Sequence, residues 1–141
     1  MYRGISRILG MDVAEGEIID TLRRKYKEYD FFYIHIKEAD KFGEDGDFSG
    51  KVRVIEEVDR LIPPILELEP DVLFIGSDHS TPSLLKSHSW HPVPFIIFSK
   101  NAMPSGASGF SERGVSGYRI RGVDVMPLVL AHARRLKKYG A

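Results

Sequence analysis

The chain of 141 residues is long enough for one domain with a hydrophobic core, and its 43% hydrophobic and 28% charged residues are normal for a soluble globular protein. Lys and Arg number 20, as do Asp and Glu, so the zero net charge gives no electrostatic footprint for nucleic acid or for an anionic membrane surface. The chain has no cysteine, which excludes disulfides, thiolate metal sites and cysteine nucleophiles.

The first part of the chain predicts a helix, a strand and a loop, in that order. Residues 1–11 lack the apolar core of a signal peptide, and no apolar stretch approaches the roughly 20 residues that span a bilayer, so we expect a cytoplasmic protein. Apolar residues at helical spacing predict a helix over about 15–29, and the aromatic and β-branched residues 31–36 predict a buried strand. Residues 38–50 are acidic and rich in glycine, which predicts a loop.

The middle of the chain predicts one more helix and two more strands. Apolar residues spaced by three and four over 54–66 predict a helix that Pro63-Pro64 must kink or divide. Residues 71–76 and 94–98 predict strands, and the glycine-rich residues 99–122 predict loops with at most one short strand.

A final helix is expected to begin at Asp124, whose side chain can cap it. The apolar face of this helix extends to Leu136, and basic residues that include Lys137 and Lys138 lie in its last turns, where the helix dipole favours them. Gly140 suits the end of the helix.

Helices and strands therefore alternate, and the predicted strands are apolar on both faces. This pattern is typical of an α/β layer fold with a mostly parallel sheet. In such folds ligands bind in the loops beyond the carboxyl ends of the strands. Three polar clusters lie next to predicted strands, at residues 38–47, 77–81 and 88–94.

The densest cluster, residues 77–81, directly follows a predicted strand. Asp78 and His79 at the tip of a strand can present an oxygen and an imidazole nitrogen to the same divalent ion, and the Ser-Thr-Pro turn that follows can hold them in place. The alternative is that Asp78 caps a short helix and His79 is merely exposed.

The second cluster places His88 and His91 on either side of Trp90, just before a predicted strand. Two histidines beside a rigid Pro-Val-Pro segment suggest a metal role for at least one of them. The alternative is an aromatic and proline packing cluster that fixes the start of the strand.

The third cluster, residues 38–47, contains five carboxylates in ten residues. Its glycines and its distal glutamate do not fall at EF-hand positions, so a solvated acidic loop is the alternative to a metal site. Together the three clusters supply histidines and carboxylates, a ligand set suited to paired Mn, Mg or Zn ions.

The same clusters resemble the metal motifs of 2,3-bisphosphoglycerate-independent phosphoglycerate mutases, which belong to the alkaline phosphatase superfamily. The archaeal type is most similar, through Tyr2-Arg3-Gly4, Gly10-Met11, residues 84–92 and residues 138–141. The resemblance implies a three-layer α/β/α fold with a mostly parallel sheet. It also implies that residues 1–141 form a single domain, the C-terminal part of the metalloenzyme.

The resemblance also implies which residues bind metal. Asp40 and His88 match ligands of one divalent ion, and Asp78 and His79 match ligands of a second, the ions being Mn, Mg, Zn or Co. Glu44 stands where the family has histidine. Either Glu44 binds as a harder ligand that favours Mn or Mg, or the first site is weakened. The remaining residues of the second cluster, Trp90 and His91, are assigned to packing.

The implied activity is the interconversion of 3-phosphoglycerate and 2-phosphoglycerate through a phosphoserine. In the family the nucleophilic serine lies in an N-terminal part, so no catalytic residue is expected in this chain, and the chain alone is expected to be inactive. Its expected partners are a phosphoglycerate substrate and a complementary N-terminal half or a second copy, with no nucleic acid and no membrane. The alternatives are a metal-dependent phosphohydrolase of the same superfamily and a non-catalytic remnant domain.

Overall fold

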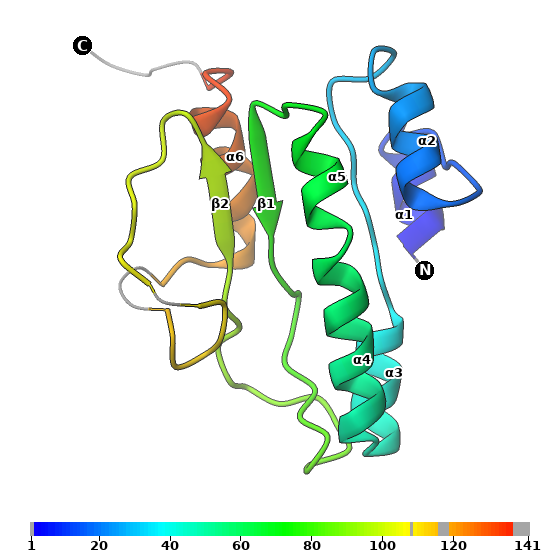
Figure 1. The fold of residues 1–141 in the computed structure, drawn as a ribbon, viewed down its shortest axis with the longest axis vertical. Helices are drawn as coiled ribbons and strands as arrows, with labels where there is room; N and C mark the ends of the chain where they lie inside the picture. Colours follow the sequence, from blue (N-terminus) through cyan, green and yellow to red (C-terminus); the bar gives the residue numbers. More distant parts are fainter. Residues whose placement is uncertain (1, 108, 116–118, 137–141) are drawn as a thin grey trace.

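The computed structural model describes residues 2–107, 109–115 and 119–136 (Figure 1). The predicted extension of the last helix to Leu136 and beyond is wrong, because this helix ends at His132. Residues 137–140, and the similarity over residues 138–141, lie outside the described part. In chain order the elements are α1 (Tyr2–Ile8), α2 (Ile18–Lys25), α3 (Glu38–Asp45), α4 (Phe48–Asp59), α5 (Ile62–Leu66), β1 (Val72–Ile75), β2 (Ile96–Ser99), a 3-10 helix η1 (Gly122–Asp124) and α6 (Val125–His132). Among these described helices, none is both long and apolar enough to cross a bilayer.

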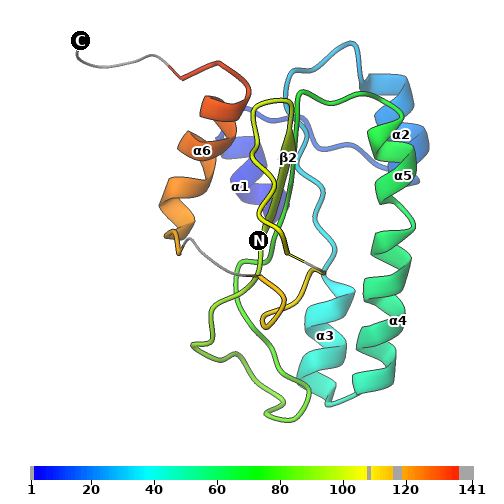
Figure 2. The same cartoon turned by 60° about the vertical axis from the view of Figure 1, so that its left-hand side comes forward.

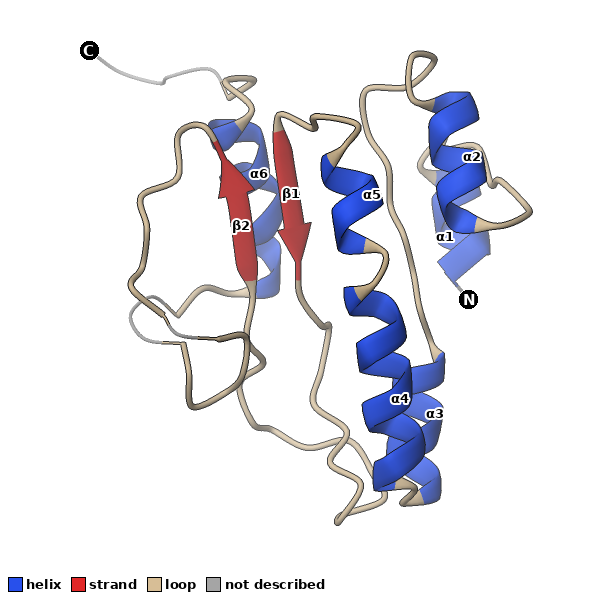
Figure 3. Ribbon diagram, in the orientation of Figure 1, coloured by secondary structure: helices blue, strands red, loops and turns tan. Residues whose placement is uncertain are grey.

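The two strands predicted around residues 71–76 and 94–98 are confirmed as β1 and β2, and they pair antiparallel (Figure 3). Val72 pairs with Ser99, and Ile75 pairs with Ile96. A parallel pair needs a crossover connection, usually a helix, whereas residues 76–95 form a long irregular loop that turns back toward the sheet. The mostly parallel sheet is therefore not found in the described part of the chain.

Helices pack around this small sheet, as Figures 1 and 2 show. Helix α6 packs against β1 on one face of the sheet, α2 packs on α5, and α3 packs on α4. Pro63 and Pro64 divide the helix predicted over 54–66 into α4 and α5, as expected, and they lie in the first turn of α5, where a missing N–H costs nothing. The α/β class is consistent with this arrangement.

The strand predicted at residues 31–36 is wrong for this structure. The segment runs extended between α2 and α3 (Figure 1), but it has no hydrogen-bonded partner strand among the described residues. A strand is defined by its ladder, so apolar composition alone does not make one. Without neighbouring strands to form a sheet that other elements could cover, Phe31 and Tyr33 remain 45% and 52% exposed.

The acidic loop predicted at residues 38–50 is also wrong, because the segment forms α3 and the start of α4. Acidic side chains in the first turn of α3 suit the positive end of the helix dipole. Gly46, at a φ of 77°, ends α3 in the left-handed conformation, and the Asp47 carboxylate then accepts the Gly50 N–H at 2.8 Å to begin α4. The glycine signal therefore marked a boundary between two helices.

Two predicted helix ends differ in detail. Helix α2 is shorter than residues 15–29, since the Glu17 side chain caps it by accepting the Asp20 N–H at 2.8 Å. The Asp124 side chain does not cap α6. Its carboxylate instead accepts the backbone N–H of Arg121 at 3.1 Å, which fixes η1 directly before α6.

The hydrophobic core expected from the composition is not formed by the described residues. Within the described ranges the buried apolar side chains are three, Ile19, Leu22 and Val54. The accessible surface is 11325 Å², whereas a compact monomer of 16.0 kDa exposes about 7,400 Å². The chain thus exposes roughly 4,000 Å² more surface than a compact monomer of its mass.

Candidate metal centre

The long loop between β1 and β2 brings two histidines together. The Ser89 N–H donates to the Ser80 carbonyl at 2.9 Å and forms an isolated antiparallel bridge between the two arms of the loop. His79 and His88 each precede one of these serines, so their rings lie side by side with centroids 3.9 Å apart. The bridge therefore explains why residues nine positions apart share one site.

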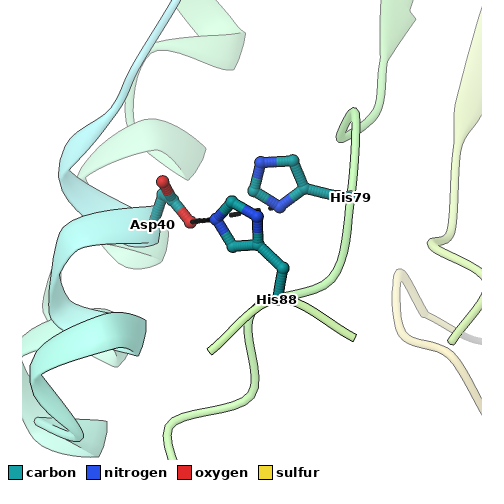
Figure 4. A group of neighbouring side chains, drawn as sticks. All are labelled: Asp40, His79 and His88. Atoms are coloured by element: carbon teal, nitrogen blue, oxygen red, sulfur yellow. Dashed lines mark ion pairs between the residues drawn. The ribbon is translucent and has the colours of Figure 1, made fainter. Parts of the chain in front are cut away.

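Helix α3 supplies the carboxylate that faces both histidines (Figure 4). The Asp40 Oδ1 atom lies 3.5 Å from His88 Nε2 and 4.0 Å from His79 Nδ1. The ligand atoms of these three residues all lie within 4.8 Å of one another, and the Asp40 side chain is only 24% exposed. Carboxylate and imidazole donors at this spacing suit a divalent ion.

Asp78 lies on the other side of His79. Its Oδ2 atom is 3.7 Å from His79 Nε2 and accepts a hydrogen bond of 2.5 Å from the Tyr2 hydroxyl. Partial burial by itself raises the pKa of Asp78, but the hydrogen bond from Tyr2 and the neighbouring backbone N–H groups outweigh it and hold this pKa below its usual range. The same hydrogen bond raises the pKa of Tyr2 to about 12.

The family of the chain follows from comparison with known proteins. The family model described as the metalloenzyme superfamily matches residues 3–131. The chain belongs to the metalloenzyme superfamily. Its ligand-rich loop and α3 both lie within the matched range.

Curated relatives show which members of this superfamily the chain is similar to. The chain is 51% identical to the probable 2,3-bisphosphoglycerate-independent phosphoglycerate mutase of Thermosipho africanus and 50% identical to that of Aquifex aeolicus, with 100% of this chain aligned in both cases. It spans 37% of the length of each relative. The solved structure of the PH0037 protein from Pyrococcus horikoshii matches 99% of this chain and 48% of that chain, at a TM-score of 0.90 and 33% identity.

In this metalloenzyme chain, Glu44 lies one helical turn after Asp40 on α3, and therefore on the same face. Its Oε1 atom is 3.5 Å from His88 Nε2. The structure thus brings Asp40, Glu44, Asp78, His79 and His88 together, as the sequence predicts. That these five residues bind metal stays a prediction.

The packing role predicted for Trp90 and His91 is wrong for the described residues. Trp90 is 87% exposed and stacks on the His91 ring at a centroid distance of 5.1 Å. The His91 Nδ1 atom lies 2.8 Å from the Ser89 hydroxyl, and among the described residues the group that could hold a metal ion, Asp40, His79 and His88, does not include His91. The pair lies on the surface because few apolar side chains from the described residues cover this loop.

Sequence reasoning missed the role of Thr81, which is 4% exposed at the centre of the site. Its hydroxyl donates to Asp40 Oδ1 at 2.6 Å and lies 3.1 Å from His79 Nδ1. Lys51 of α4 donates to the Thr81 carbonyl at 2.6 Å. The Ser-Thr-Pro turn was the only available signal, and it gave no indication of which atoms the threonine would contact.

Proposed function

We propose that this chain supplies the C-terminal metal-ligand part of a cofactor-independent phosphoglycerate mutase, which interconverts 3-phosphoglycerate and 2-phosphoglycerate in the cytoplasm. The observation that carries the proposal is the convergence of Asp40, Asp78, His79 and His88 in one cluster. This convergence occurs in a chain whose sequence is 50–51% identical to proteins named as probable phosphoglycerate mutases.

Two groups of side chains would hold two divalent ions. Asp40, Glu44 and His88 lie together on one side, and Asp78 lies with His79 on the other. When bound, paired ions neutralise the charge of a transferring phosphoryl group and stabilise a serine alkoxide. Three carboxylates among five ligands favour the harder Mn or Mg over Zn or Co.

The nucleophile of this proposed reaction would come from outside the chain. Ser77 directly precedes Asp78, but its hydroxyl donates to the His79 carbonyl at 2.8 Å and so helps to fix the loop. Asp78 and His79 would also leave most coordination positions of their ion open. A second polypeptide segment would supply both the serine and the missing ligands.

The exposed surface supports such a partner. The chain exposes roughly 4,000 Å² more than a compact monomer of its mass, which exceeds the roughly 1,000–2,500 Å² that each partner of an obligate interface buries. We propose that this surface packs against a complementary N-terminal half. Residues 1–141 would then form part of one three-layer α/β/α domain with a mostly parallel sheet.

The experiment is a coupled assay on the purified chain with 3-phosphoglycerate and Mn²⁺. The chain alone should show no turnover, and addition of the remaining N-terminal portion of the Thermosipho africanus relative should restore it. Asp78→Ala should abolish the restored activity. Hydrolysis of phosphate monoesters without mutase turnover would favour a phosphohydrolase instead, and a complex that forms but stays inactive would indicate a remnant domain.

A further inference from the structure

The cluster can be divided between metal ions in two ways. Asp40, His79 and His88 lie within 4.8 Å of one another and could hold one ion, with His79 using Nδ1. Alternatively His79 uses Nε2, which lies 3.7 Å from Asp78 Oδ2, and belongs to a second ion. The protonation of the His79 ring decides between them, because only the nitrogen without a proton can bind metal.

We propose that Thr81 is a positioning residue that sets the tautomer of His79 and thereby assigns this histidine to Asp78. This inference rests on the metal-binding role proposed above. It concerns a residue that is not itself a proposed ligand.

Proton counting at the Thr81 hydroxyl gives the direction of each hydrogen bond. The hydroxyl has one hydrogen, and the Asp40 carboxylate at 2.6 Å can only accept it. The remaining contact, to His79 Nδ1 at 3.1 Å, must therefore be donated by the ring. The Lys51 ammonium does not compete, because it donates to the Thr81 carbonyl and not to the hydroxyl.

The consequence is a fixed division of ligands. With its proton on Nδ1, His79 keeps the lone pair on Nε2, the nitrogen nearest to Asp78 Oδ2. Asp40 Oδ1 keeps its free lone pairs for the side occupied by His88 and Glu44. One hydroxyl thus touches a predicted ligand of each ion and holds the two groups apart.

The surroundings of Thr81 are rigid enough for this task. Its side chain is almost fully buried, and Lys51 from α4 holds its carbonyl at 2.6 Å. Helix α3 approaches so closely that a Cβ atom added at Gly43 would lie 2.4 Å from the Thr81 carbonyl oxygen. Outer residues that orient histidine ligands in this way are worth about 10–100-fold in metal affinity.

The first test is nitrogen-15 NMR of the histidine rings in the metal-free chain, with the His79 signals assigned by their loss in His79→Gln. We expect His79 to carry its proton on Nδ1. Thr81→Val, which keeps the shape and removes the hydroxyl, should shift His79 toward the other tautomer, whereas Thr81→Ser should keep the original one. A His79 ring protonated on Nε2 in the unsubstituted chain would overturn the proposal.

The second test is calorimetric titration with Mn²⁺. Thr81→Val should weaken binding about 10–100-fold, Thr81→Ser should restore it to within a few-fold, and Thr21→Val, a matched change at an exposed hydroxyl outside the site, should have no effect. Equal losses for the valine and serine variants would contradict the proposal. If the unsubstituted chain binds no metal, the proposed function fails, while the NMR result still decides the role of Thr81. Should Thr81→Val not fold, Thr81→Ser and the unsubstituted chain keep the tautomer test decisive.

Discussion

The candidate metal centre and the sheet region differ in how completely this chain's own residues surround them. The polar groups of the centre have hydrogen-bond partners within the chain, whereas apolar side chains near the sheet remain exposed. At the centre, Thr81 is 4% exposed, and its hydroxyl and carbonyl both have partners from other segments. In the sheet region Phe98 of β2 is 53% exposed, and the neighbouring loop leaves Met103 91% exposed.

The difference shows which forces are local in this fold. Apart from the hydrogen bond that Tyr2 donates to Asp78, the hydrogen bonds described at the centre join groups within α3, α4 and one loop, all between Glu38 and His91. Burial of apolar surface needs a whole domain, because area is removed from water only when enough chain surrounds it. The side chains of the centre can therefore come together in a chain that does not bury a full hydrophobic core.

The largest expected effect tests whether the ligands of the centre act as predicted. His88→Ala should reduce Mn²⁺ affinity by more than about 100-fold, because it removes a ligand rather than an outer contact. His91→Ala is the matched control, since His91 lies three residues away and contacts Ser89 and Trp90. Calorimetric titration measures both, and equal losses would mean that His88 and His91 have been assigned wrongly.

A smaller effect is expected where α3 meets the loop. Gly43→Ala forces a Cβ atom to within 2.4 Å of the Thr81 carbonyl, so α3 must shift, at a cost of about 1–3 kcal/mol in the free energy of unfolding. Gly4→Ala on α1 meets nothing within 4 Å and should leave stability unchanged or slightly higher. Urea unfolding compares the two, and an unaffected Gly43→Ala would show that α3 is not tightly packed there.

The exposed region can be followed through its single tryptophan. Trp90 is 87% exposed, so its fluorescence in the chain alone should resemble that of tryptophan in water and be quenched readily by iodide. Addition of the complementary N-terminal portion should shift the emission to the blue and protect it from quenching. Emission that is already blue-shifted in the chain alone would contradict the exposed position.

The sequence predictions succeeded where the structure depends on short local motifs and failed where it depends on distant parts of the chain. The convergence of Asp40, His79 and His88 was predictable because each belongs to a short motif next to a predicted strand, and the three residues do lie together. The strand predicted at residues 31–36 does not form, because strand formation depends on a partner that the described residues do not provide. Glycine and acidic residues at 38–50 suggested a loop, yet they are equally compatible with two capped helices.

The smallest expected effect concerns α1, which reaches the centre through Tyr2. Its hydroxyl donates to Asp78 Oδ2, and this hydrogen bond together with the negative charge of Asp78 raises the pKa of Tyr2 to about 12. Because the folded pKa lies above the ordinary value of 10.0, the stabilisation is present below that pH and is lost as the pH rises toward about 12.

The pKa values of Tyr26, Tyr29 and Tyr33 are raised as well. Alkaline titration of tyrosinate absorbance should therefore show a latest component, with a pKa of about 12, that Tyr2→Phe removes. Asp78→Asn keeps all six tyrosines but takes away the acceptor charge, so it should return the late transition toward the ordinary pKa. The effect is small because the Asp78 side chain is 55% exposed, and a hydrogen bond to a group in contact with water is worth little. A latest component that Tyr2→Phe leaves unchanged would show that α1 does not dock on Asp78 in solution, and that the centre is held by α3, α4 and its loop alone.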